Sequence, residues 1–248
     1  MEQHRFKIMK YIIIVLIVIS ITTCGRDNKE TKLFKVEYNG ALKNMMREGD
    51  ISAKTDLAVF KNTKHFYALG AIENLKGEIQ IFDSKPFNTM LIDSTLTFDN
   101  SFNKKATLLV YASVSKWKSI EIPDNVVTYE QLESYIEKSA KENKINIDEP
   151  FPFLIMGTLK SFDWHVINWK DGDTEHSHEK HKSSGPHGTI NNRQVEMLGF
   201  YSNSHHAIFT HHTTNMHIHV ITVDHKIAGH VDGLTLKKGM ILKLPDTK

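Results

Sequence analysis

The chain has 248 residues, of which 40% are apolar and 24% charged, and its formal net charge at pH 7 is +2. Such a composition is ordinary for a globular protein, and the length suffices for one large or two small domains with a substantial core. The basic residues are scattered and nearly balanced by acidic ones, which argues against a nucleic-acid partner. The one cysteine cannot form a disulfide within the chain, so the fold must depend on its apolar core.

The N-terminal residues have the layout of an export signal. Basic residues at positions 5, 7 and 10 precede an apolar run over 11–21, which is too short for a comfortable membrane span. The following Ile21-Thr22-Thr23-Cys24 resembles a bacterial lipobox, although Thr23 replaces the usual Gly, Ala or Ser. We therefore expect a lipoprotein-type signal peptide over 1–23, lipidation at Cys24 and a polar tether over 24–32. The alternative is an uncleaved N-terminal anchor. Either way, we expect an exported protein held at a membrane, in the periplasm or at the cell surface.

The rest of the chain is predicted to be rich in strands, with two helices. A short helix over 40–47 ends before Gly49, and a second begins at the capping box Thr128-Tyr129-Glu130-Gln131 and ends before Pro150. Many strands with few helices indicate the α+β class. The expected strands are residues 57–60, 78–82, 95–98, 106–113, 153–159, 165–169, 194–201, 217–223 and 240–244.

A histidine-rich tract, residues 175–181 with His187 beyond it, lies among Asp, Gly, Ser and Pro residues. This composition is typical of a flexible surface loop. We expect the tract to be disordered and without function, and weak metal affinity is the alternative.

The strongest chemical signal is a predicted hairpin near the C-terminus. Residues two apart in a strand face the same side, so His217 and His219 project together from the β-branched run that contains them. Asp224 and Gly229 allow the chain to turn, and His230 then lies opposite His219 across the ladder. Three neutral imidazoles with a free fourth position suit a catalytic zinc or a similar first-row divalent ion. The alternative is that these histidines are ordinary half-buried strand residues.

This hairpin resembles the metal-binding hairpin of bacterial alpha-acetolactate decarboxylases. Residues 68–83 are similar to that family's early strand pair, in which a Gly-Glu follows a turn and precedes an alternating strand. Weaker similarities follow in the family's order at 153–159, 198–200 and 242–245. The chain is thus identified as a divergent, lipoprotein-like member of this family.

The resemblance implies a fold of two β-rich halves with few helices and with the metal site in the cleft between them. One half would hold a mixed sheet, and the other a smaller antiparallel sheet or barrel. We place the N-terminal half at 33–160 and the C-terminal half, with the metal hairpin, at 161–248.

The resemblance also implies an activity. The family decarboxylates (S)-2-acetolactate to acetoin, and a divalent metal, most simply zinc, stabilises the enediolate that remains when CO₂ is lost. No organic cofactor is implied, and the substrate is a small molecule. His217, His219 and His230 would hold the metal. Glu78 matches the family's upstream Glu, which lies near the substrate and handles protons; the alternative is a solvated carboxylate after a turn.

The sequence departs from the family pattern at two polar positions. Tyr201 stands where the family has an Arg that faces the substrate's charge, and Ile241 stands where it has an acidic residue, for which Asp232 or another acid is a candidate replacement. Two His-His pairs follow Tyr201 in the loop 202–215. Because the loop leads into the ligand strand, we count Tyr201, His205 and His206 as candidate catalytic residues, with His211 and His212 as further candidates. The alternative is that the loop histidines are solvated.

These departures leave two functions open. The first is decarboxylation of acetolactate or of a related 2-hydroxy-3-oxo acid. The second is an exported, lipid-anchored module that binds zinc or copper and keeps the fold without the chemistry. A closed set of metal ligands would favour the second function. A homodimer is compatible with the sequence.

Overall fold

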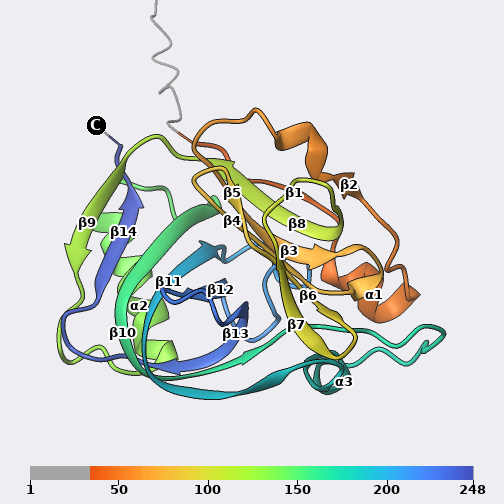
Figure 1. The fold of residues 1–248 in the computed structure, drawn as a ribbon. Coiled ribbons are helices and arrows are strands. Elements are labelled where there is room, and N and C mark those ends of the chain that lie inside the picture. Colours follow the sequence, from red (N-terminus) through yellow and green to blue (C-terminus); the bar gives the residue numbers. More distant parts are fainter. Residues whose placement is uncertain (1–33, 248) are drawn as a thin grey trace, which may run out of the picture. The chain divides into compact units, whose positions relative to one another are not determined.

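The computed structural model describes residues 34–247, and the expected signal peptide, tether and Cys24 lie outside them. The described part belongs to one compact unit, Lys32–Lys248. Two antiparallel sheets form most of it (Figure 1). Among the described residues, no helix has both the length and the apolar character that a membrane span requires.

The first sheet has eight strands and is built from residues 37–113. Its strands follow the order β1-β8-β3-β4-β6-β7, with β2 paired to β8 and β5 to β4. The strands β3 and β4 at its centre are buried along their whole length. Their bounds are β1 Glu37–Asn39, β2 Thr55–Asp56, β3 Phe66–Ile72, β4 Glu78–Phe82, β5 Lys85–Pro86, β6 Asn88–Ile92, β7 Thr95–Asp99 and β8 Lys105–Ser113.

The second sheet has six strands, in the order β11-β12-β13-β10-β14-β9. The long strand β10 also pairs with β11, so β10, β11, β12 and β13 form a closed cycle of neighbours. In both sheets every pairing of the described strands is antiparallel, so the mixed sheet that we expected is not observed. The bounds are β9 Trp117–Glu121, β10 Phe151–His165, β11 His187–Tyr201, β12 Met216–Thr222, β13 Ala228–Thr235 and β14 Ile241–Pro245.

Both predicted helices are present. The helix α1 (Leu42–Glu48) ends at Gly49, whose φ of 64° is the left-handed conformation that glycine adopts most easily. The helix α2 (Tyr129–Glu142) begins at the expected capping box, in which the Thr128 hydroxyl accepts from the Gln131 backbone N–H.

Three local predictions were wrong. Residues 57–60 form a 3-10 helix, η1 (Leu57–Phe60), because the Asp56 carboxylate accepts a hydrogen bond from the Ala58 backbone N–H and caps a helical turn. The strand expected at 165–169 stops at His165, and its last four residues are irregular. The tract expected to be disordered contains a short helix, α3 (His178–Ser183), which Ser177 caps.

Apolar layers fix the second sheet on both faces. One core packs α2 against β10 to β14 through residues such as Leu132, Ile136 and Ile218. Another joins the two sheets, with Leu69 from β3 and Leu198 from β11 among its buried members. Side chains of β4 and β12 also meet between the sheets, although the two strands are far apart in the sequence: Gln80 Oε1 lies 3.2 Å from His219 Nδ1. The change from one sheet to the other occurs between Ser113 and Trp117, whereas the boundary expected at 160 and 161 lies inside β10.

Candidate metal centre

The hairpin of β12 and β13 brings the three predicted metal ligands together. The register pairs His219 directly with His230, and His217 precedes His219 by two residues on the same face of β12. The turn between the strands is held by the Thr222 hydroxyl, which accepts hydrogen bonds from the backbone N–H groups of Lys226 and Ile227. The strand pairing and the turn together hold the three histidines in place.

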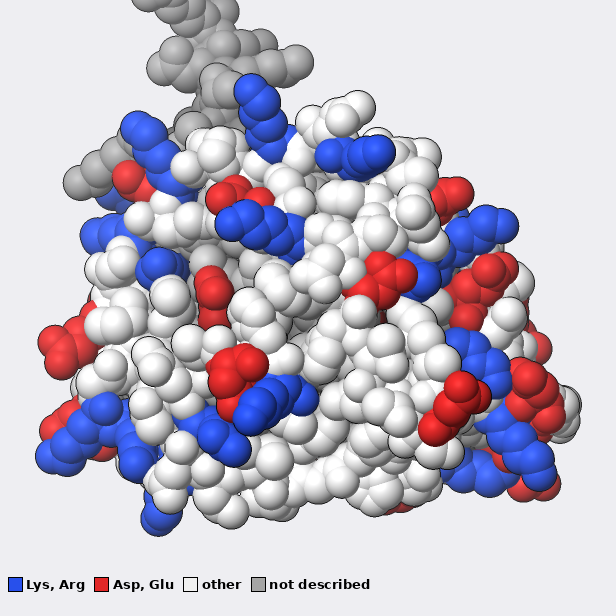
Figure 2. Space-filling view, viewed as in Figure 1, with Lys and Arg blue, Asp and Glu red and all other residues white. Residues whose placement is uncertain are grey.

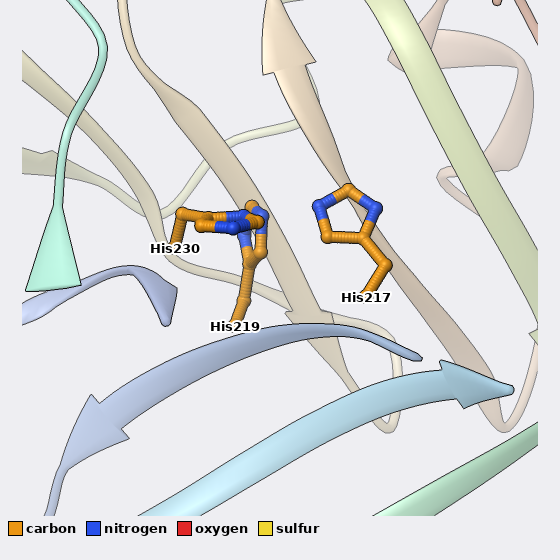
Figure 3. Close-up of side chains that lie close together, drawn as sticks. All are labelled: His217, His219 and His230. Carbon is orange, nitrogen blue, oxygen red and sulfur yellow. The ribbon is translucent and has the colours of Figure 1, made fainter. Parts of the chain in front are cut away.

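The three imidazoles form one cluster. One ligand nitrogen from each of His217, His219 and His230 lies within 4.8 Å of the others. Figure 3 shows the rings rising from the hairpin into a common space. Burial lowers the pKa of His217 to about 4 and lowers the pKa values of His219 and His230 well below the ordinary range. At neutral pH the rings are therefore uncharged and have lone pairs available.

This cluster fits a divalent metal ion. His217 and His219 are almost fully buried, yet His217 Nδ1 and His219 Nε2 have no hydrogen-bond partner among the described residues. Buried polar nitrogens without partners are costly, and coordination to a metal would satisfy them. Neutral imidazole nitrogens suit a first-row divalent ion, whereas calcium and magnesium prefer oxygen ligands.

A carboxyl group from the first sheet lies beside the cluster. Glu78 begins β4 and is buried, with Oε2 3.7 Å from His219 Nε2 and with Oε1 accepting a hydrogen bond of 3.1 Å from the backbone N–H of Ile167. Burial raises the pKa of Glu78 to about 8, and the nearby charge of Asp232 acts in the same direction. The alternative of a solvated carboxylate does not describe this side chain.

Gln80, two residues along the same strand, orients His219. Its Oε1 lies 3.2 Å from His219 Nδ1, and its side-chain amide donates to the Phe87 carbonyl and, at 2.8 Å, to the Thr89 hydroxyl. Because both amide hydrogens have acceptors, Oε1 is the atom that faces His219 and it requires a proton on Nδ1. His219 Nε2 is thereby left with its lone pair toward the cluster. Gln80 carries no local sequence signal, because its role depends on contact between the two sheets.

A histidine and aspartate pair also adjoins the cluster. His165 Nδ1 lies 2.9 Å from Asp232 Oδ2, and both side chains are nearly fully buried. The His165 ring also contacts His230, at 4.8 Å between ring centroids. His165 was expected only as a strand residue, and no local sequence signal connects it to Asp232. The sequence suggests Asp232 only as a replacement for a missing acid.

Two of the three clustered histidines, His217 and His230, border one cavity of about 1080 Å³, as does His165. It is lined by Glu78 and Asp232, by Lys43 and Arg47 of α1, and by side chains from α2, α3 and the loop before β12. On the molecular face in Figure 2, basic and acidic side chains are interspersed over the surface. Eight histidines line the cavity: His165, His176, His178, His181, His211, His212, His217 and His230.

Tyr201, one of the candidate catalytic residues, points away from this cavity. It pairs with Met216 in the register of β11 and β12, so its side chain shares the face of Met216 and Ile218, opposite to that of His217. Its ring stacks on Phe151, and its hydroxyl donates to the Glu137 carboxylate at 3.0 Å.

The loop before β12 presents its second pair of histidines to the cavity. His211 and His212 line it, whereas His205 and His206 do not. The His205 Nδ1 is 2.8 Å from the Ser202 hydroxyl and its ring stacks on Phe209, while His206 Nε2 is 2.8 Å from Asn215 Oδ1. These contacts hold the first pair outside the cavity. Ile241 lies on β14, where it pairs with Met156 and Glu121.

Two antiparallel sheets with a three-histidine cluster at their junction define the molecule as a β-rich protein with a candidate metal centre. The family model for alpha-acetolactate decarboxylase matches residues 38–243, and the chain belongs to that family. The alpha-acetolactate decarboxylase of Bacillus subtilis strain 168 has a similar structure, with a TM-score of 0.66, 15% identity and 85% of each chain covered.

Two further solved structures show the same fold. The acetolactate decarboxylase of Bacillus subtilis subspecies spizizenii gives a TM-score of 0.66 at 16% identity, with 85% of each chain covered. A Staphylococcus aureus protein of unknown function, described as similar to alpha-acetolactate decarboxylase, gives 0.65 at 13% identity, with 84% of each chain covered. Comparison with curated proteins gives no match. Family and fold thus both match acetolactate decarboxylases.

Proposed function

We propose that this protein is a metal-dependent decarboxylase that converts (S)-2-acetolactate, or a related 2-hydroxy-3-oxo acid, to acetoin or the corresponding hydroxyketone. The observation that carries the proposal is the Glu78 carboxyl group beside three converging imidazoles, on the wall of a cavity large enough for a small substrate. Membership of the acetolactate decarboxylase family supports the same reaction class.

In this proposal His217, His219 and His230 hold a zinc ion. A bound divalent ion supplies positive charge that stabilises the negative charge developing on the substrate's carbonyl and hydroxyl oxygens as CO₂ leaves. His217 and His230 line the cavity, and the cluster has three protein ligands, so a fourth position would be left for a substrate, which a closed structural site lacks. Gln80 keeps His219 in the tautomer with a free Nε2.

Glu78 is the group that we assign to proton transfer. Its Oε2 faces the cluster and its Oε1 is held by the Ile167 N–H, so the carboxyl group is fixed in one orientation. Protonation of the carbon that loses CO₂ must come from one face to set the stereochemistry of the product. A carboxyl held rigidly at one side of the site is suited to that step.

Charged groups on the cavity wall would receive the substrate's carboxylate. Lys43 and Arg47 lie on the same helix, α1, one turn apart, and both line the cavity. We propose that these two cations supply the attraction for the substrate's carboxylate that an arginine provides in the family, at the position where this chain has Tyr201. His211 and His212 also line the cavity, from the loop before β12, and burial lowers the pKa of His211, so that ring is uncharged at neutral pH.

The direct test measures acetoin from racemic acetolactate after incubation with the purified, zinc-loaded protein. We expect turnover that is lost in His217→Ala. A wild-type rate no higher than that of His217→Ala would refute the enzyme proposal and favour the alternative of a metal-binding module. Elemental analysis after extensive dialysis should find about one tightly held metal equivalent per chain, consistent with a single three-histidine site. Its retention in a triple Ala variant at His217, His219 and His230 would refute the ligand assignment.

We also propose that the protein is exported and anchored to a membrane through a lipid on Cys24. The basic residues, the apolar run and the lipobox-like Ile21-Thr22-Thr23-Cys24 support this location. Growth with a labelled fatty acid should label the wild-type protein and leave Cys24→Ala unlabelled. Equal labelling of both proteins would contradict the proposal.

A further inference from the structure

A second pair of imidazole nitrogens converges at the wall of the same cavity. His176 Nδ1 lies 2.9 Å from His181 Nε2, and both residues line the cavity. Neither belongs to the three-histidine cluster, and the decarboxylation proposed above uses neither of them. They come from the tract 175–181, which the sequence suggested was a disordered loop.

Packing against Trp169 fixes this pair. The Trp169 ring stacks on His176 with centroids 4.4 Å apart, and it meets His181 edge-on at 4.8 Å. The indole N–H donates to the Asp173 carbonyl at 3.0 Å, and Lys180 bonds both carboxylate oxygens of Asp173 at 3.1 Å. The tract is thus tied to the wall of the cavity, and the two nitrogens are held in place before any ligand binds.

We propose that His176 and His181 form a second binding site for a first-row divalent cation such as Zn²⁺, at the wall of the cavity that contains the three-histidine cluster. Zinc binds histidine nitrogen at about 2.0–2.1 Å, so two nitrogens of a tetrahedral site are roughly 3.3 Å apart. The observed separation needs to widen by only a few tenths of an ångström. Solvent or a neighbouring side chain would complete the coordination.

The charge state of the two rings is compatible with metal binding, because neither ring is protonated to a cation at neutral pH. Burial lowers the pKa of both rings, and that of His181 falls to about 4, so both are neutral at pH 7. Without a metal, one ring donates an N–H hydrogen bond to the other across the 2.9 Å contact. Coordination requires only that this ring carry its proton on the opposite nitrogen, and no proton has to leave the protein.

Further imidazoles lie close by. His178, on the same helix as His181, contacts His211 at 4.9 Å between ring centroids, and His211 contacts His212 at 4.0 Å. All three line the cavity. The proposed second site and the three-histidine cluster therefore share a cavity with three more potential ligands.

Isothermal titration of the untagged, metal-free full chain with Zn²⁺ tests the proposal. We expect two equivalents in the wild type, of which the weaker is lost in the double variant His176→Asn and His181→Asn. The matched control is His187→Asn, because His187 is an exposed histidine just beyond the tract, and it should keep both equivalents. A single equivalent in the wild type, or a weaker one that survives in the double variant, would overturn the proposal.

A second measurement does not depend on the reaction or on the central cluster. In a variant with His217, His219 and His230 all changed to Asn, Cu²⁺ should quench part of the tryptophan fluorescence, since Trp169 touches both proposed ligands. Quenching should disappear when His176→Asn and His181→Asn are added. Quenching that is unchanged by this addition would refute the site even if the decarboxylase activity is confirmed.

Discussion

Glu78 Oε2 and His219 Nε2 lie 3.7 Å apart, although one residue belongs to the first sheet and the other to the second. The contact exists because β4 and β12 face each other across the layer that joins the sheets. It places an acid at the edge of the candidate metal centre, where it is able to reach a substrate bound there.

Replacing Glu78 by Gln should separate catalysis from metal binding. We expect acetoin formation to fall by about 10²–10⁴-fold, the usual contribution of a positioned acid or base, while one tightly held metal equivalent remains. Activity assays and elemental analysis on the same preparation test this. Glu73→Gln is the control, since Glu73 lies in the adjacent short helix η2 (Glu73–Leu75) and does not line the cavity. A near-normal rate in Glu78→Gln would show that the proton comes from another group.

Gln80 should control metal affinity without touching the metal. Gln80→Met removes the acceptor for His219 Nδ1–H, and loss of such a supporting contact typically weakens metal binding by about 10–100-fold. Competition with a chromophoric chelator measures the change. Thr89→Val removes only a partner of the Gln80 amide and leaves the acceptor, so its effect should be much smaller. Equal losses in both variants would mean that packing, and not the tautomer of His219, decides the affinity.

The metal ligands were predictable from the sequence because they depend on local geometry. The two-residue period of a strand places His217 and His219 on one face, and a short hairpin brings His230 opposite His219. Tyr201 shows the limit of this reasoning. Its strand was predicted, but the side on which its ring lies depends on the register with β12, which no sequence pattern specified.

Tertiary contacts determine the parts of the site that were missed. Gln80 and His165 act through residues far away in the chain, His219 and Asp232. The tract around His176 is polar and rich in turn residues, which is typical of a loop, yet it packs on Trp169. Composition indicates the conformation that a segment adopts in isolation. It does not show which surface the segment packs against after folding.

Tyr201→Phe should affect stability and leave the reaction unchanged. The variant loses the hydrogen bond to Glu137, which should cost about 1 kcal/mol in the free energy of unfolding. The ion pair with Lys141 and then the Tyr201 bond lower the pKa of Glu137, so this stabilisation is present above the ordinary Glu pKa and is lost as pH falls through the lower folded value.

Urea unfolding at neutral pH and at about pH 3.5, below the ordinary pKa of Glu, measures that dependence. The difference between wild type and Tyr201→Phe should be largest at neutral pH and should shrink in acid. Loss of acetoin formation with normal stability would instead show that Tyr201 takes part in catalysis, as its alignment with the family's arginine suggested.

Gly229 should be intolerant of any side chain, because β10 passes directly over it. An added Cβ would lie 2.4 Å from the backbone oxygen of His165 and 3.1 Å from Val166 Cγ2. Relief of that clash requires β10 and β13 to separate next to His230, so Gly229→Ala should lose about 1–3 kcal/mol of stability. It should also weaken metal binding, because His230 moves relative to His219.

Gly233→Ala, on the same strand, is the control: its Cβ would meet only Asp163 Oδ2, at 3.5 Å. Thermal unfolding with and without zinc measures both effects, at about 2–4 °C per kcal/mol for a chain of this size. If Gly229→Ala and Gly233→Ala melt at the same temperature and bind zinc equally well, the close approach of β10 does not constrain the metal hairpin.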